Sequence, residues 1–319
     1  MPYLIGTDEA GYGPNLGPLV VTGTLWEIPS VDVDLYKLFA EVVDSKRSPD
    51  RIAVCDSKEI YKSSGTIEAL ERSVLSLLDS PAANWRELVA GLGCGREKTE
   101  TESWLVGAEF QLPMLTDLEE IENLKERFLA CCESVGVKLL EVQTSTLFPK
   151  KFNEAIESQG NKANVLSSTT LEIVSKLLNS VTGPLPTDGK PQPVRIVCDK
   201  HGGRSKYAAV IQNCLTEQPV LVHEESRSTS RYSWTTDTAD VAIEFNAGGE
   251  SALPVALASM VSKYVREVYM KLWNRFWLTH LPGIKPTKGY PQDAKRFFSE
   301  IQSRCQELQI QRETVWRTR

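Results

Sequence analysis

Four acidic residues occupy positions where carboxylates can do chemistry. Asp8 and Glu9 are adjacent at the end of an apolar segment. Asp199 ends a second apolar segment, and Glu267 lies within a long helical pattern. Carboxylates are the ligands that Mg²⁺ and Mn²⁺ prefer, and two such ions can activate a water molecule for attack on a phosphodiester.

Each of these acids also has an ordinary structural explanation. Acids are common where a strand meets a turn, which accounts for the first pair without a metal. Asp199 can face water from a loop, although open α/β sheets place ligands at the carboxyl ends of their strands. Glu267 follows Lys263 by four residues, the spacing of a surface ion pair on a helix. Residues 200–204, directly after Asp199, are cationic and glycine-rich and suit phosphate contacts.

Histidine and cysteine are poorly placed for a zinc site or a disulfide framework. The chain has three histidines and seven cysteines, with no His-x-x-x-His and no Cys-x-x-Cys. An odd number of cysteines without such spacing favours free thiols in a reducing compartment. We therefore expect a cytoplasmic protein whose metal ligands, where present, are carboxylates.

The elements that must position these acids follow from apolar periodicity. Strands are expected at 3–8, 18–27, 137–142 and 194–199, with a β-rich, polar segment at 219–245. Helices are expected at 66–78, 117–134, 164–180, 253–280 and 292–309. The Gly/Pro/Asn-rich segment 11–18 turns the chain between the first two strands. Strands interspersed with helices predict an α/β fold with a mixed sheet.

Composition places the 319-residue chain among ordinary globular proteins. Lys and Arg total 36 and Asp and Glu total 42, a formal net charge of −6, which excludes a generally basic protein. The 12 cationic and 5 acidic residues from Ala258 to Arg319 nevertheless give that segment a charge of +7. The sequence has no run of 18 apolar residues and no basic signal-peptide start, so no membrane span or export signal is expected.

The acids belong to short motifs that occur in a defined order. The motifs are Gly-Thr-Asp-Glu-Ala-Gly-Tyr-Gly-Pro at 6–14, Asp-Ser-Lys at 56–58, Asn-Val-Leu at 164–166, Val-Cys-Asp at 197–199, Ala-Ser-Met-Val-Ser-Lys-Tyr-Val-Arg-Glu at 258–267 and Gly-Tyr-Pro-Gln-Asp at 289–293. In order and in sequence they resemble ribonuclease HII, the type 2 ribonuclease H family. The resemblance implies a ribonuclease H-like fold, with a central mixed β-sheet flanked by helices.

The same resemblance implies a domain organisation. Motifs from residue 6 to 293 predict a single catalytic domain over 1–319, because the site needs both ends of the chain. Segments at about 80–135 and 215–250 match no motif and are expected to be insertions. A basic helical tail is expected at about 292–319.

The resemblance also implies a site and a substrate. It assigns two Mg²⁺ or Mn²⁺ ions to Asp8, Glu9, Asp199 and Glu267. The implied partner is an RNA–DNA hybrid, whose RNA strand or embedded ribonucleotides are hydrolysed. The substrate-binding residues that it implies are Gly11 and Gly13 at the ribose, Lys58, Lys263 and Arg266 at phosphates, and the aromatic residues Tyr12 and Tyr290.

The sequence departs from the family pattern at two positions. The family's Gly-Arg-Gly reads Gly11-Tyr12-Gly13, and tyrosine can stack on a sugar or base but makes no charged phosphate contact. The family's fourth acid is aspartate, and Glu267 is one methylene longer. We expect retained divalent-metal binding with a preference for Mn²⁺.

Three other interpretations stay open. A hybrid-binding or scaffold protein would keep the fold and relax the site, as the departures at 12 and 267 allow. Another ribonuclease H-fold nuclease, such as a junction resolvase or structure-specific DNase, would apply the same carboxylates to a different duplex. An acidic cytosolic α/β protein unrelated to nucleic acid would leave the ordered motifs unexplained. The sequence indicates no oligomeric state.

Overall fold

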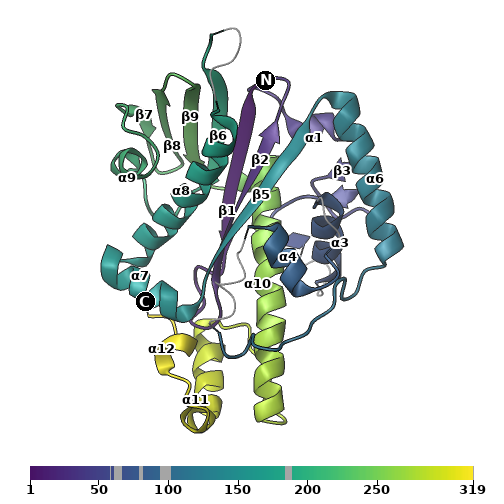
Figure 1. Cartoon of the computed structure of the whole chain (residues 1–319), viewed down its shortest axis with the longest axis vertical. Coiled ribbons are helices and arrows are strands. Elements are labelled where there is room, and N and C mark those ends of the chain that lie inside the picture. Colours follow the sequence, from purple (N-terminus) through teal and green to yellow (C-terminus); the bar gives the residue numbers. More distant parts are fainter. Residues whose placement is uncertain (58, 61–66, 79–81, 94–101, 184–188, 319) are drawn as a thin grey trace.

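Seven strands form one mixed β-sheet, in the order β5-β2-β1-β6-β9-β8-β7 (Figure 1). They are β1 (Tyr3–Ala10), β2 (Leu19–Glu27), β5 (Lys138–Leu147), β6 (Gln192–Asp199), β7 (Leu221–Glu225), β8 (Thr229–Thr235) and β9 (Ala239–Asn246). The β1–β6 and β6–β9 pairs are parallel, and the other neighbours are antiparallel. The computed structural model describes residues 1–57, 59–60, 67–78, 82–93, 102–183 and 189–318. The α/β fold with a mixed sheet is therefore confirmed.

Helices and one short strand pair complete the chain. The helices are α1 (Leu35–Leu38), α3 (Glu68–Leu77), α4 (Trp85–Gly91), α6 (Leu118–Val135), α7 (Pro149–Gln159), α8 (Lys162–Val181), α9 (Ala208–Cys214), the 3₁₀ helix η1 (Gly249–Ser251), α10 (Leu253–His280), α11 (Pro291–Glu307) and α12 (Arg312–Val315). The short strands β3 (Val43–Asp44) and β4 (Ile52–Ala53) pair in parallel. None of these helices is long and apolar enough to span a membrane.

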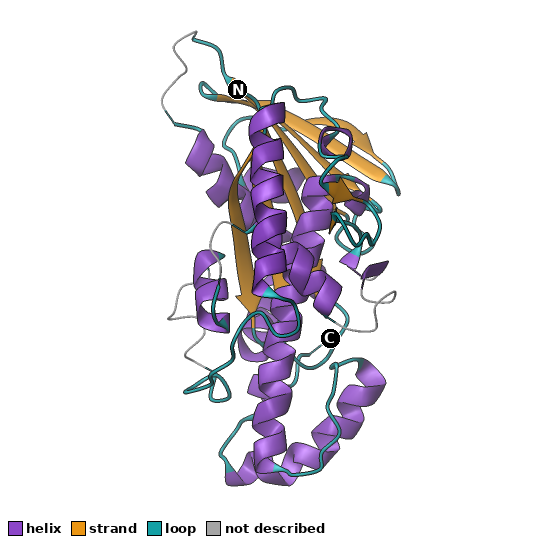
Figure 2. Cartoon of the chain, turned by 90° about the vertical axis from the view of Figure 1, so that its right-hand side faces the viewer, coloured by secondary structure: helices purple, strands orange, loops and turns teal. Residues whose placement is uncertain are grey.

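Both faces of the sheet are covered, so neighbouring residues of one strand enter different cores. Leu4 packs in the core that contains α10, and Ile5 packs in the core that contains α8. Gly6 allows α10 to approach, because a Cβ there would lie 2.4 Å from the carbonyl carbon of Pro254. Figure 2 shows helices on both sides of the strands. In Figure 1, α11 and α12 lie beside the lower half of α10, beyond the sheet.

The segment expected as the second insertion contributes to the central sheet. Residues 219–245 were expected to be β-rich, and they contain β7, β8 and most of β9. Strand β9 pairs in parallel with β6, the strand that ends in Asp199. This part of the chain therefore positions the candidate site rather than lying apart from it.

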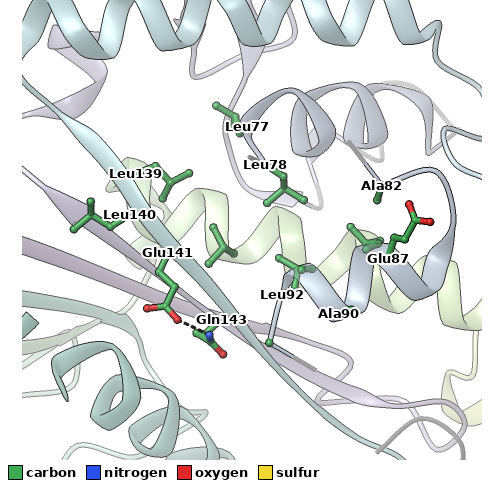
Figure 3. A pocket seen from close by; sticks show the side chains of 14 residues that line it. Leu77, Leu78, Ala82, Glu87, Ala90, Leu92, Leu139, Leu140, Glu141 and Gln143 are labelled. Atoms are coloured by element: carbon green, nitrogen blue, oxygen red, sulfur yellow. Dashed lines mark hydrogen bonds between the residues drawn. The ribbon is translucent and has the colours of Figure 1, made fainter. Parts of the chain in front are cut away.

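A cavity of about 340 Å³ lies between α4 and β5 (Figure 3). Its lining is mostly apolar, and leucines predominate. The side chains of Glu141 and Gln143, which are among its polar lining residues, hydrogen-bond to each other. None of the four candidate carboxylates lines this cavity.

Candidate active site

Asp8 and Asp199 lie at the same edge of the sheet and face the same side. Strands β1 and β6 are parallel, and Thr7 pairs with Cys198, so the two acids follow at matching positions. Val197 packs in the core that contains α10 and Cys198 in the opposite core. Because side chains alternate along a strand, Asp199 points toward the α10 side, as Asp8 does. By the same alternation, Glu9 points toward the α8 side.

Asp8 is buried among like charges. Its side chain is 6% exposed, and Ser262 Oγ donates to its backbone carbonyl at 3.2 Å. Burial raises the pKa of Asp8 well above its usual range, and the carboxylates of Glu9, Asp199 and Glu250 raise it further. A hydrogen bond from the Ser259 side chain acts in the opposite direction on this pKa. Four carboxylates therefore act on one another at this edge of the sheet.

Glu250 joins this group, although the sequence did not single it out. It lies in η1, the short turn between β9 and α10. The neighbouring Gly249 N–H donates to Asp199 Oδ1 at 3.0 Å, which fixes the turn against the end of β6. In the sequence, the signal for Glu250 was an acid in a glycine-containing turn just before a long helix. It became informative only once β9 was known to lie beside β6.

The donor set fits a hard divalent cation. Carboxylate oxygens are the ligands that Mg²⁺ and Mn²⁺ prefer, and a bound cation relieves the repulsion around Asp8. In the described part of the chain, however, no three His, Cys, Asp or Glu side chains lie close enough together to hold one ion.

Glu267 makes different contacts from the other three predicted ligands. Its Oε1 lies 2.6 Å from Lys263 Nζ and 3.9 Å from Arg266 Nη1. It follows Ser259, which hydrogen-bonds Asp8, by eight residues, or about 12 Å along the helix axis. The i,i+4 ion pair that was the ordinary explanation of this residue is present. Its assignment as a metal ligand stays a prediction.

Arg266 lies under the loop that connects β1 and β2. Its side chain is 1% exposed, and its Nη2 donates to the carbonyls of Leu16 and Lys288 at 3.3 and 3.1 Å. A Cβ on Gly11, whose φ is +88°, would lie 2.5 Å from Arg266 Nε. This burial argues against the expected phosphate contact. Arg266 instead supports the loop that carries Gly11 and Gly13.

A second buried arginine, from the C-terminal part of the chain, hydrogen-bonds the same loop. Arg317 is 2% exposed and donates to the carbonyls of Gly11 and Tyr12 at 2.7 and 3.0 Å. Its backbone N–H donates to the carbonyl of Asn15 at 2.8 Å. Motif searching did not find Arg317, because its partners are main-chain carbonyls about 300 residues earlier.

Of the remaining expected substrate residues, those that the structure describes lie in or beside this loop. Gly13 is exposed, and Lys58 lies outside the described residues. Tyr290, 52% exposed at the start of α11, lies near Arg266: burial lowers the pKa of the Arg266 guanidinium, and Glu267 and Tyr290 oppose that shift. The ring of Tyr12 lies 4.6 Å from Lys162 Nζ, a neighbour that the motifs did not predict.

No protein-family model matches the sequence, and no curated protein matches it. Solved structures match nearly its whole length. Ribonuclease HII of Archaeoglobus fulgidus, solved with PCNA, aligns over 99% of this chain and 94% of its own, at 15% identity and a TM-score of 0.41. Ribonuclease H2 of Pyrococcus horikoshii OT3 aligns over 98% and 92%, at 14% identity and a TM-score of 0.43. Bst-RNase HIII in complex with Mn²⁺ aligns over 99% and 66%, at 16% identity and a TM-score of 0.41.

Proposed function

We propose that this chain is a metal-dependent endonuclease that hydrolyses RNA, as a strand or as embedded ribonucleotides, within RNA–DNA duplexes. The observation that carries the proposal is the sheet edge where β1 and β6 end. Asp8 and Asp199 face one side of the sheet there, and Glu9 and Glu250 act electrostatically on Asp8. The ordered sequence motifs that resemble ribonuclease HII support the proposal independently.

Two Mg²⁺ or Mn²⁺ ions are the cofactor that this activity requires. When bound, they supply an activated water for in-line attack and stabilise the leaving oxygen. We assign Asp8, Asp199 and Glu250 as the residues that would hold them, together with Glu9, whose side chain would reach the ions from the other side at the end of β1. Glu267, which the resemblance assigns to the same task, is paired with Lys263 and is tested beside Glu250.

The β1–β2 loop is the part of the chain that we assign to the ribose. Gly13 is exposed and lacks a Cβ, so its backbone can approach a sugar closely. The missing Cβ of Gly11 makes room for Arg266 and Pro18 under the loop. Contact with the 2′-hydroxyl is how a protein distinguishes RNA from DNA. Arg266 and Arg317 fix this loop through main-chain carbonyls and so hold its backbone in place for that contact.

Hydrolysis of three labelled duplexes tests the proposal. They are a long RNA–DNA hybrid, a DNA duplex with one ribonucleotide and an all-DNA junction, each in Mg²⁺ and in Mn²⁺. We expect cleavage of the first two only. Asp8→Asn should lose more than the roughly 10–100-fold that loss of an outer-shell partner of a metal costs. Absence of cleavage in both metals, or equal cleavage by Asp8→Asn, contradicts the proposal.

A second candidate is a hybrid-binding protein with a relaxed site. The observation that favours it is the dispersed arrangement of the acids, which in the described residues form no ready group of three ligands. This candidate predicts hybrid binding without cleavage and no stabilisation by Mn²⁺. The duplex assay and a metal titration therefore separate the two.

A further inference from the structure

We propose that Arg204 and Lys162, which come from two segments that meet at Tyr12, form a binding site for a backbone phosphate of a nucleic acid. This inference deepens the proposed function and rests on it for the identity of the duplex. It assigns to two residues from other elements the charged contact that Tyr12 cannot make. Arg204 belongs to the segment 200–204 that the sequence already indicated for phosphate contacts, whereas Lys162 was not expected.

Tyr12 brings three elements together beside the carboxylates. Lys162, at the start of α8, places its Nζ 4.6 Å from the centroid of the Tyr12 ring. A Cβ on Gly202, in the loop after β6, would lie 3.7 Å from the Tyr12 hydroxyl. Burial raises the pKa of the Tyr12 hydroxyl, the nearby Glu9 raises it further, and the nearby Arg204 lowers it. The two cations therefore lie next to the acidic edge of the sheet.

The guanidinium of Arg204 is oriented by neutral groups. Its Nη1 donates to Ser167 Oγ at 3.2 Å, and its Nη2 donates to Asn164 Oδ1. It also lies 5.8 Å from the centroid of the Tyr207 ring. Neutral acceptors fix the direction of a guanidinium without cancelling its charge. Such an arginine is held in a fixed orientation and keeps the positive charge that binds an anion.

Neither cation is neutralised by a carboxylate within the part of the chain that the structure describes. The ion pairs formed there involve neither Arg204 nor Lys162. Lys200, on the same loop as Arg204, behaves differently. Lys200 is 8% exposed, and its Nζ donates to the Ser226 carbonyl at 2.8 Å and to Ser230 Oγ at 3.0 Å. Its ammonium group therefore stabilises the local fold.

A phosphodiester is the ligand that this arrangement favours. The phosphates of an approaching nucleic acid are repelled by the carboxylates of Asp8 and Glu9. Cations beside these carboxylates reduce that repulsion. Arginine binds phosphate through its planar fork, and lysine adds a point charge.

The salt dependence of duplex binding tests this site. Every protein carries Asp8→Asn, so that the labelled RNA–DNA hybrid stays intact, and affinity is measured in Mn²⁺ between about 50 and 200 mM NaCl. Arg204→Ala and Lys162→Ala should each lower the slope of log affinity against log salt by about one and weaken binding about 10-fold. Arg204→Lys should keep the slope while losing part of the affinity. Lys206→Ala, an exposed cation on the same loop, is the matched control and should change neither.

The outcomes separate this inference from the proposed function. An unchanged slope in both alanine variants, an equal loss in Lys206→Ala, or no hybrid binding by the reference protein overturns the phosphate site. If the Asp8-containing chain cleaves the hybrid while the slopes stay unchanged, only this inference fails. If it cleaves nothing while the slopes fall, the phosphate site stands and the catalytic proposal fails.

Discussion

Asp8 is the residue around which the candidate site is organised. Its carboxyl group is buried, three other carboxylates repel it, and Ser259 hydrogen-bonds it. A buried carboxylate among like charges is costly unless it keeps a proton or gains a cation. The identity of the fourth ligand then depends on whether Glu250 or Glu267 shares that cation.

Glu250→Gln should remove most of the rise in Tm that saturating Mn²⁺ gives to the wild type. The reason is that Glu250 acts directly on Asp8, and a ligand that binds only the folded state stabilises it. Glu267→Gln should keep that rise and lose about 1–3 kcal/mol of stability, because it removes the charged partner from the 2.6 Å ion pair with the largely buried Lys263. Thermal unfolding with and without Mn²⁺ measures both effects. The reverse pattern would place Glu267 at the metal.

Glu102 provides a test of pH dependence away from the site. It is 7% exposed, and burial raises its pKa although Trp104 Nε1 donates to it at 3.1 Å. The folded state therefore holds this proton more tightly than the unfolded chain, so stability falls as the pH rises above the unfolded pKa. Glu102→Gln keeps an acceptor for Trp104 and carries no charge. It should raise Tm at pH 7 and give no gain below about pH 4; a lower Tm at pH 7 would contradict this account.

The sequence was most informative about acids at strand ends. Asp8 and Asp199 could be selected because each follows an apolar segment, and the structure places them side by side. Glu250 could not be selected, because its three-residue turn has no periodicity and its neighbours come from β1 and β6. For Glu267, spacing alone had indicated the pair with Lys263 that the structure contains. Local patterns thus predicted local contacts, and the site depends on long-range ones.

At the scale of elements, the β1–β2 loop depends on parts of the chain that are distant in sequence. Arg317 binds the carbonyls of Gly11 and Tyr12, and Gly289 accepts hydrogen bonds from Asn15 and Leu16. Asn153 of α7 holds the residues around Arg317, because its Oδ1 accepts from the Thr318 N–H at 2.8 Å. The rigidity of the loop that we assign to the ribose therefore depends on these hydrogen bonds.

Arg317→Ala should destabilise the protein by about 2–4 kcal/mol, since two charge-assisted hydrogen bonds are lost and two carbonyls lose their partner. Hydrogen exchange should accelerate at the amides of residues 11–17 before it does elsewhere. Arg312→Ala is the matched control, because Arg312 is exposed and its guanidinium lies over the rings of Phe298 and Trp316, contacts worth about 0.5–1 kcal/mol. Urea unfolding and exchange measure the two effects, and equal losses in both variants would rule out a specific role for Arg317.

Element prediction succeeded where apolar periodicity was long. The helices expected at 164–180 and 253–280 are α8 and α10, and the strand expected at 3–8 is β1. Helix α7 was missed because only Pro149, Phe152 and Asn153 are buried in its 11 residues, too few to give a clear stripe. The parallel pairing of β1 with β6 could not be predicted, because about 190 residues separate their paired positions.

For the whole molecule, charge is distributed unevenly. Residues 258–319 carry +7, which leaves −13 on residues 1–257, and the candidate carboxylates other than Glu267 belong to the acidic part. Duplex nucleic acid carries one negative charge per about 1.7 Å, so its approach to this edge is unfavourable without bound cations. Divalent ions should therefore control affinity as well as chemistry.

The electrostatic account predicts that Asp199→Asn changes duplex affinity in opposite directions without and with divalent ions. In EDTA, Asp199→Asn removes one negative charge at the sheet edge and should bind duplex about fivefold more tightly than the wild type, the factor for about 1 kcal/mol of charge interaction. In Mn²⁺ the same variant should bind more weakly, because it loses a ligand that we assign to the ion. Fluorescence anisotropy with an all-DNA duplex measures both arms, since phosphate contacts do not depend on sequence and the proposed activity leaves DNA intact. Weaker binding in both conditions would indicate that Asp199 shapes the edge through its hydrogen bond with Gly249 and not through its charge.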